Sequence, residues 1–381
     1  MGITRREMLR TICGGACLPL FAGGGAAVAS AQNEGTEEEF KGIFEIREVP
    51  YYEKLDGKTI QCKICPKECK VGDQERGYCG NKENRGGKYF TLAYGNPCAY
   101  HVDPIEKKPL FHFLPGTAAF SISTAGCNFN CKFCQNWDIS QSRPEQTPNV
   151  KMMPGDVVHY AKQSGSATIA YTYGEPVVFY KYMYDTAALG HKQGVRSVMI
   201  TNGYINKKPM RELLKVLDAV KVDFKAYTKK FYTDTCDGEL KPVLDTLVLL
   251  KEEGMWTELV YLVVPTLNDS KKELQSMTKW IMKNLGPDVP IHFSRFHPTY
   301  MIKNLPSTPI QTLEMARDTA MEGGLNFAYI GNVPNHEGEN TCCPGCKSII
   351  VERMGYTITK MEINKSGKCR KCGHRIPGVW K

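Results

Sequence analysis

The sequence predicts an α/β protein built on a partial (β/α)6 barrel of the TIM type. An N-terminal cysteine-rich module and a C-terminal zinc-ribbon-like module are expected on either side of it. From about residue 118, short β-rich runs alternate with helical stretches, which is typical of parallel βαβ units. Most of the 16 cysteines fall at 62–79, 127–134 and 342–372, and such clustering favours metal or iron–sulfur ligation over a disulfide framework.

The predicted strands are short runs rich in β-branched and aromatic residues. They are Ala119–Thr124, Thr168–Thr172, Val195–Thr201, Val220–Phe224, Thr257–Val264 and Ile291–Phe296, with Phe327–Ile330 as a further candidate. Helices are expected between them, for example at Asp156–Gln163, Val177–His191, Lys207–Leu217 and Leu240–Glu253. Barrels of this type carry their chemistry at the carboxyl ends of the strands, so functional residues are expected there.

The first residues have the pattern of an export signal. Arg5 and Arg6 precede a weakly apolar run that ends in a small-residue cleavage site at Ala29-Ser30-Ala31. Paired arginines before such a run are typical of a twin-arginine signal peptide. We therefore expect export to the periplasm or another extracytoplasmic space, with a cytoplasmic protein as the alternative. No span long and apolar enough to cross a membrane is expected in the mature chain.

Composition and charge divide the rest of the chain. We expect a twin-arginine signal at 1–31, a linker at 32–55, a cysteine-rich module at 56–110, the core at 111–335 and a ribbon-like module at 341–381. Of the formal charge of +9, residues 1–31 carry +2 and the tail from Thr341 carries +7, so the body is neutral. A neutral body does not favour nucleic-acid binding.

A cysteine motif follows the first predicted strand. Cys127, Cys131 and Cys134 have the spacing C-x3-C-x2-C, with Phe133 before the last cysteine. Three thiolates on a short loop can hold three corners of a [4Fe–4S] cubane and leave the fourth iron open for a ligand. The motif and its place resemble the signature of the radical S-adenosylmethionine (SAM) superfamily. That resemblance implies a radical SAM barrel in which reductive cleavage of SAM yields a 5′-deoxyadenosyl radical.

Residues at the later strand ends agree with the resemblance. Gly174, Glu175 and Pro176 resemble the family's glycine-rich turn, whose backbone meets the SAM amino group. Thr201 and Asn202 resemble its ribose-side motif. Asp223 and Lys225 resemble an Asp-x-Lys element of glycyl-radical activating enzymes, and His297 stands where such an enzyme has a histidine near SAM. The resemblance therefore assigns these eight residues to SAM binding.

Longer motifs resemble a narrower family. The run Lys108–Gly116, the segments Thr124–Cys127 and Cys134–Trp137, and the upstream cysteine run look like the AmmeMemoRadiSam-system radical SAM enzyme, over roughly residues 56–335. That family is related to pyruvate formate-lyase activating enzymes. The resemblance implies a low-potential electron donor as partner, together with MEMO-like and AMMECR-like proteins or a glycyl-radical enzyme.

The two flanking cysteine sets have different spacings. One set is Cys62, Cys65, Cys69 and Cys79, for which we expect a structural metal, with an auxiliary cluster as the second alternative and disulfides as the third. Cys98 is close enough in the sequence to replace one of the four. Cys343, Cys346, Cys369 and Cys372 form two CxxC knuckles, which favours one structural zinc, with rubredoxin-type iron as the alternative. Because no strand-end residue lies in the tail, we expect the ribbon to stand outside the active site.

Two classes of function follow from these patterns. The leading interpretation is a radical SAM enzyme that abstracts hydrogen from a substrate, either as a glycyl-radical activase or in an AmmeMemoRadiSam-type modification. The alternative is an iron–sulfur or zinc protein for electron transfer or scaffolding without SAM turnover. The residues at 175 and 202 favour the enzyme, because a scaffold needs no SAM pocket.

Overall fold

The computed structural model describes residues 42–381, and the account below is of this part of the chain. The expected signal at 1–31 and residues 32–41 of the expected linker lie outside the described residues. Among residues 42–381 the structure contains no helix with the length and apolar character of a membrane span.

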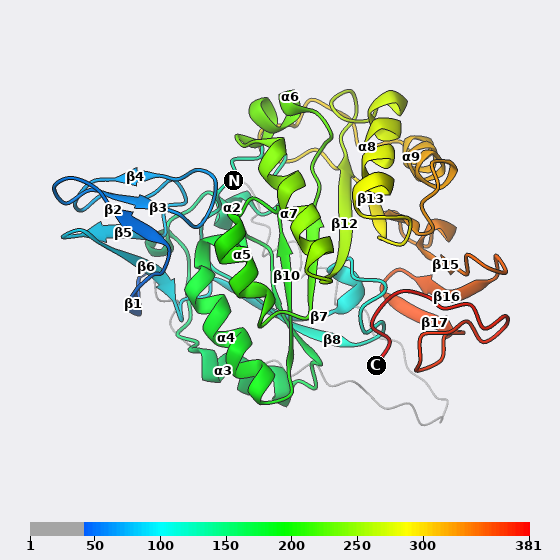
Figure 1. The fold of residues 1–381 in the computed structure, drawn as a ribbon, viewed down its shortest axis with the longest axis horizontal. Helices are drawn as coiled ribbons and strands as arrows, with labels where there is room; N and C mark the ends of the chain where they lie inside the picture. Colours follow the sequence, from blue (N-terminus) through cyan, green and yellow to red (C-terminus); the bar gives the residue numbers. More distant parts are fainter. Residues whose placement is uncertain (1–41) are drawn as a thin grey trace, which may run out of the picture. The chain divides into compact units, whose positions relative to one another are not determined.

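An eight-stranded sheet forms the centre of the fold, in the order β14-β13-β12-β11-β10-β9-β8-β7 (Figure 1). The strands are β7 (Ala99–Pro104), β8 (Ala118–Ser123), β9 (Thr168–Tyr171), β10 (Arg196–Thr201), β11 (Ala219–Asp223), β12 (Trp256–Val263), β13 (Ile291–Arg295) and β14 (Ala328–Gly331). Neighbouring strands from β8 to β14 are parallel, and β7 pairs antiparallel with β8. The partial barrel is confirmed, and the further candidate strand at 327–330 belongs to it as β14.

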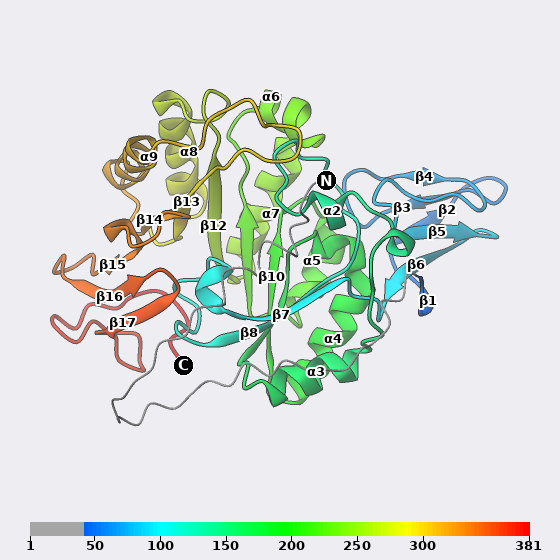
Figure 2. The same cartoon turned by 180° about the vertical axis from the view of Figure 1, so that it is seen from behind.

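Helices follow the parallel strands and cover the outer face of the sheet (Figures 1 and 2). The longer ones are α3 (Pro154–Gln163), α4 (Tyr180–Lys192), α5 (Lys207–Leu214), α7 (Leu240–Glu252), α8 (Lys271–Asn284) and α9 (Ile310–Glu322). Short turns complete the connections: η1 (Ile105–Lys107), α2 (Trp137–Ser140), η2 (Pro144–Gln146), η3 (Pro176–Phe179), α6 (Lys229–Phe231), η4 (Tyr232–Cys236) and η5 (Glu337–Glu339). Strand β9 is buried along its whole length, as expected for a parallel strand covered on both faces.

Two small three-stranded sheets form the N-terminal module. One pairs β1 (Glu45–Glu48), β6 (Lys88–Tyr94) and β5 (Lys82–Arg85); the other pairs β2 (Tyr52–Lys54), β3 (Ile60–Cys62) and β4 (Lys70–Val71). Strands β1 and β2 fall within the segment that we expected to be a linker. That expectation is wrong for residues 45–54, because both strands find ladder partners in the cysteine-rich module.

The C-terminal module is a sheet of β15 (Thr341–Cys342), β16 (Ile349–Met354) and β17 (Thr357–Met361), on the opposite side of the barrel from β1–β6 (Figure 2). Its buried residues Ile350 and Val351 share a core with Phe111 and Tyr329 of the barrel. The last residues also pair with the barrel, since Val379 exchanges backbone hydrogen bonds with His112 and Leu114 at 2.7 Å. The ribbon is therefore packed onto the barrel.

Candidate active site

The three motif cysteines lie on the loop after β8, here called the cluster loop (residues 124–136). All three thiols line one cavity of about 480 Å³ at the carboxyl ends of the strands. Burial raises the pKa of Cys127 well above its ordinary value, and the nearby Glu175 adds to this shift. A thiolate in such surroundings needs a cation beside it, which the irons of a cluster supply. The donor set and its burial therefore fit a [4Fe–4S] cluster.

The π-helix η4 is hydrogen-bonded to the cluster loop. Backbone N–H groups of Asn130 and Lys132 donate to the carbonyls of Cys236 and Thr235, at 3.0 and 2.9 Å. Cys236 also lies against Cys131, whose pKa it raises together with burial. Sequence reasoning missed this role of Cys236, because an isolated cysteine carries no spacing signal. Single-turn π segments of this kind are frequent at functional sites.

Glu175 is buried at the end of β9, and its carboxylate organises the next strand end. It accepts hydrogen bonds from the Thr201 hydroxyl at 2.7 Å, and from the backbone N–H groups of Asn202 and Val177 at 2.8 and 3.1 Å. Burial raises its pKa to about 7 against these bonds. A side chain at the preceding Gly174 would be crowded, since a Cβ there would stand 3.0 Å from the Ser123 hydroxyl and 3.2 Å from the Thr124 carbonyl.

Asn202 ties the end of β10 to the cluster loop. Its amide donates to the Asn128 side chain at 2.8 Å, and Asn128 in turn donates to the Tyr204 carbonyl at 2.8 Å. Asn128 directly follows Cys127 in the chain. This pair of amides therefore positions the first cluster ligand relative to the third parallel strand.

Asp223 lies between two lysines at the end of β11. It forms an ion pair with Lys225 at 3.1 Å and a shorter one with Lys221. Burial opposes its ionisation, but the two ammonium groups outweigh burial and hold its pKa at about 2. The acid is thus charged at neutral pH. The sequence did not predict Lys221 as a site residue, because it lies inside the strand, between Val220 and Val222. The only signal was a charged residue within an apolar run.

The structure brings most of the predicted site residues to one cavity. Beside the three cysteines, its lining includes Gly174, Glu175, Asn202, Asp223 and Lys225. Thr201 and Pro176 do not line the cavity. Thr201 donates a hydrogen bond to Glu175, and Pro176 is buried as the first residue of η3. His297 is exposed, contacts Ser307 at 3.0 Å and does not line the cavity. Its assignment to SAM stays a prediction.

The ribbon reaches the same cavity, contrary to our expectation. Gly355 and Tyr356 of the ribbon line it, together with Glu339 of η5 and with Phe111 and His292. The buried guanidinium of Arg353 joins the ribbon to the barrel. It donates to the carbonyls of Phe111 and Glu339 at 3.0 Å and lies 4.0 Å from the centre of the Phe111 ring. No sequence spacing links residues 111 and 353, so only the fold reveals this contact.

Comparison with known proteins places the fold and cysteine motif in a family. A model of the radical SAM superfamily matches residues 121–277. The chain is 45% identical over 332 residues to the uncharacterized protein MJ0808 of Methanocaldococcus jannaschii, which covers 87% of this chain and 99% of that protein. The chain belongs to the radical SAM superfamily. A [4Fe–4S] cluster and SAM are the cofactors that this membership implies.

Two relatives of this radical SAM protein carry activity names. The pyruvate formate-lyase-activating enzyme of Clostridium pasteurianum is 24% identical over 163 residues, covering 42% of this chain and 67% of that enzyme. The benzylsuccinate synthase activating enzyme of Thauera aromatica is 22% identical over 267 residues, covering 66% of this chain and 78% of that enzyme. The similarity therefore extends to activating enzymes.

The four tail cysteines converge on one point. Their sulfurs all lie within 4.8 Å of one another, with Cys343 3.6 Å from Cys372 and Cys346 3.9 Å from Cys369. A single tetrahedral ion with metal–sulfur bonds of about 2.3 Å needs such spacing. Cys342 is not part of the group. The knuckles are thus preformed for a metal, and zinc remains the ion that we expect.

Proposed function

We propose that this chain is a radical SAM enzyme that abstracts hydrogen from a substrate, either to activate a glycyl-radical enzyme or in an AmmeMemoRadiSam-type modification. The observation that carries the proposal is the cavity shared by three buried thiols and the strand-end residues at 174, 175, 202, 223 and 225. The activity names of the two relatives support the activase branch. When bound, a reduced [4Fe–4S] cluster supplies one electron to break a carbon–sulfur bond of SAM.

The chain's own residues prepare the site for that chemistry. Glu175 holds the Thr201-Asn202 turn, and Asn202 holds the cluster loop, so the three thiols keep their places relative to the strand ends. Lys225, whose pKa Asp223 and Cys131 raise against the effect of burial, places a fixed positive charge beside the thiolates. The preorganised cation offsets part of the negative charge that three thiolates bring into a buried site.

SAM cleavage tests the assignment directly. Anaerobic, reduced protein should form 5′-deoxyadenosine from SAM, and the variant with Cys127, Cys131 and Cys134 all changed to Ala should form none. Undiminished formation by the variant would contradict the assignment. If the intact protein binds its clusters and forms no 5′-deoxyadenosine, the electron-transfer or scaffold function takes its place.

Export by the twin-arginine pathway is a separate proposal, supported by Arg5, Arg6 and the small-residue site before residue 32. A reporter fused to residues 1–31 should leave the cytoplasm only when the twin-arginine machinery is active. Retained export of the variant with both arginines changed to Lys would contradict the proposal.

A further inference from the structure

Four thiols outside the active site surround one enclosed space, here called the four-cysteine cavity. Its cysteines are Cys62, Cys65, Cys69 and Cys79. The side chain of Tyr89 lines the same cavity, and its hydroxyl and the Cys69 sulfur both lie close to Gly77. Cys98 does not line this cavity and instead donates to the Ser123 carbonyl at 3.7 Å. Four ligands, and not five, therefore define the site.

The spacing of these thiols differs from that of the tail. Within residues 42–381, the tail cysteines are the only group of three or more potential metal ligands whose donor atoms all lie within 4.8 Å of one another. The thiols of the four-cysteine cavity are thus spread more widely than one tetrahedral ion requires. The three thiols of the cluster loop are spread in the same way. A cubane carries its thiolates on its outer corners, so wide spacing fits a cluster.

The surroundings suit an anionic cluster. Lys82 is 3% exposed, and its ammonium lies 3.8 Å from the Cys79 sulfur while it donates to the Val178 carbonyl at 2.6 Å. The backbone N–H of Tyr78 donates to the Cys69 sulfur at 3.4 Å. A buried cation and N–H donors to sulfur stabilise the negative charge of a thiolate-bound cluster.

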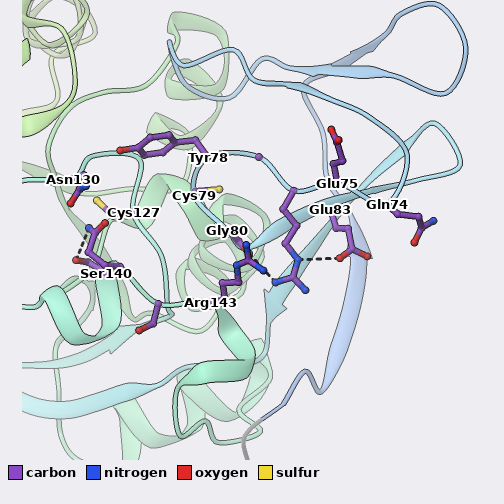
Figure 3. Close-up of a pocket in the computed structure, with 14 residues that line it drawn as sticks. Gln74, Glu75, Tyr78, Cys79, Gly80, Glu83, Cys127, Asn130, Ser140 and Arg143 are labelled. Carbon is purple, nitrogen blue, oxygen red and sulfur yellow. Dashed lines mark hydrogen bonds and ion pairs between the residues drawn. The ribbon is translucent and has the colours of Figure 1, made fainter.

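The four-cysteine cavity is adjacent to the cluster loop. A Cβ on Gly126 would stand 2.5 Å from the Cys79 carbonyl, so the two backbones touch. Asn81 joins them as well: it accepts from the Cys79 thiol at 3.5 Å and donates to the Ala125 carbonyl at 3.0 Å. Figure 3 shows Cys79 and Cys127 lining one open cavity of about 780 Å³, with Tyr78 beside them.

We propose that the four-cysteine cavity holds a second [4Fe–4S] cluster, which relays one electron to the cluster of the cluster loop. The electron comes from a low-potential donor of the flavodoxin or ferredoxin class, which is oxidised by one electron. The second cluster is reduced and then reoxidised, and no bond forms or breaks in this step. The binding of the cluster stands on its own, whereas the relay rests on the proposed function. This inference replaces the structural metal that we expected at these cysteines.

Iron and sulfide analysis tests the second cluster in the full chain. After anaerobic reconstitution, the variant with Cys127, Cys131 and Cys134 changed to Ala should keep about four irons and four acid-labile sulfides per chain. Its reduced form should give an electron paramagnetic resonance signal that SAM does not alter. Sulfide distinguishes this cluster from a single iron in the tail. Absence of sulfide from this variant, or two zinc ions per chain, would overturn the proposal.

A second variant tests the relay. Cys65→Ala should lose the SAM-insensitive signal and keep the SAM-responsive one, whereas Cys98→Ala, the matched control, should keep both. With reduced flavodoxin as donor, 5′-deoxyadenosine formation by Cys65→Ala should fall on the order of ten-fold, while titanium(III) citrate, which is small enough to reach the active-site cluster, should restore it.

The outcomes separate the two proposals. Equal rates for wild type and Cys65→Ala with flavodoxin would overturn the relay and leave the proposed function intact. No 5′-deoxyadenosine from any protein with either reductant would overturn the proposed function and the relay together. The sulfide content of the triple variant decides the second cluster in both cases, including the case in which Cys65→Ala does not fold.

Discussion

The carboxylate of Glu175 acts as a positioning group, because it joins the end of β10 to the turn after β9 through three hydrogen bonds. Its three donors belong to Thr201, Asn202 and Val177. In a glutamine of the same size, an NH2 group that can only donate replaces one of the two acceptor oxygens, so at least one of these donors loses its acceptor. An unmade buried hydrogen bond costs about 1–3 kcal/mol. Loss of one of these bonds should therefore disturb Asn202 and the cluster loop that Asn202 holds, and so weaken the binding of SAM.

Glu175→Gln should lower the affinity for SAM about ten-fold and destabilise the fold by about 1–3 kcal/mol. Calorimetric SAM binding and urea unfolding measure the two effects. Glu253→Gln is the matched control, since Glu253 pairs with Arg211 on the surface and such pairs contribute little. Unchanged SAM affinity in Glu175→Gln would show that the loop keeps its place without the carboxylate.

His112 gives the fold a pH dependence. Burial lowers its pKa to about 4, and its ring nitrogens contact the Pro377 carbonyl at 2.7 Å and the Tyr329 hydroxyl at 2.6 Å. The unfolded chain takes up a proton below about pH 6.5, whereas the folded chain does so only near pH 4, so stability falls between these values as pH falls. The loss is on the order of 3 kcal/mol.

Urea unfolding of wild type and His112→Gln at pH 7 and pH 4.5 measures this dependence. The stability advantage of the wild type should shrink as pH falls, because the variant lacks the titrating ring. His191→Gln is the matched control for the loss of a histidine, because His191 is partly exposed and lies outside the contact between the barrel and the tail. A constant difference between wild type and His112→Gln would mean that the ring takes up its proton at the same pH in the folded and unfolded chains, so that burial does not lower its pKa.

At the scale of elements, the sequence predicted the strands well and the contacts between modules poorly. The six expected barrel strands are present within two residues at each end, because buried parallel strands are short apolar runs whose pattern is local. Strands β1 and β2 were missed because Glu45–Glu48 and Tyr52–Lys54 are mostly exposed and polar, and form only against β6 and β3. Arg353 reaches Phe111 across the fold, and no local pattern records such a contact.

The two cysteine knuckles of the tail, where we expect zinc, allow a test at the same scale. Cys346→Ser should lose one zinc per chain and speed hydrogen exchange in β16 and β17, because a small ribbon buries too little core to fold without its metal. Cys342→Ser is the matched control, since Cys342 stands beside Cys343 but outside the metal group. Equal zinc content in the two variants would refute the ligand set.

For the whole molecule, the ribbon is part of the cavity wall. Arg353→Ala would leave the carbonyls of Phe111 and Glu339 without their donors and should cost about 3 kcal/mol, with faster exchange at the hairpin tip around Tyr356. Urea unfolding and hydrogen exchange measure this change. Arg370→Ala, at an exposed position of the same module, should have little effect. If the two variants are equally stable, the ribbon is not held through Arg353.

The docking of the last residues onto the barrel also sets a timetable for biosynthesis. His112 and Leu114 bond to Val379, which the ribosome adds more than 260 residues after them. At a translation rate of about 5–20 residues per second, the tail residues that pack near Phe111 and Phe113 are made on the order of tens of seconds after them. The nascent chain therefore exposes this apolar surface until the residues around Val379 have been translated, and a chaperone that shields residues 111–114 would raise the yield of correctly assembled protein.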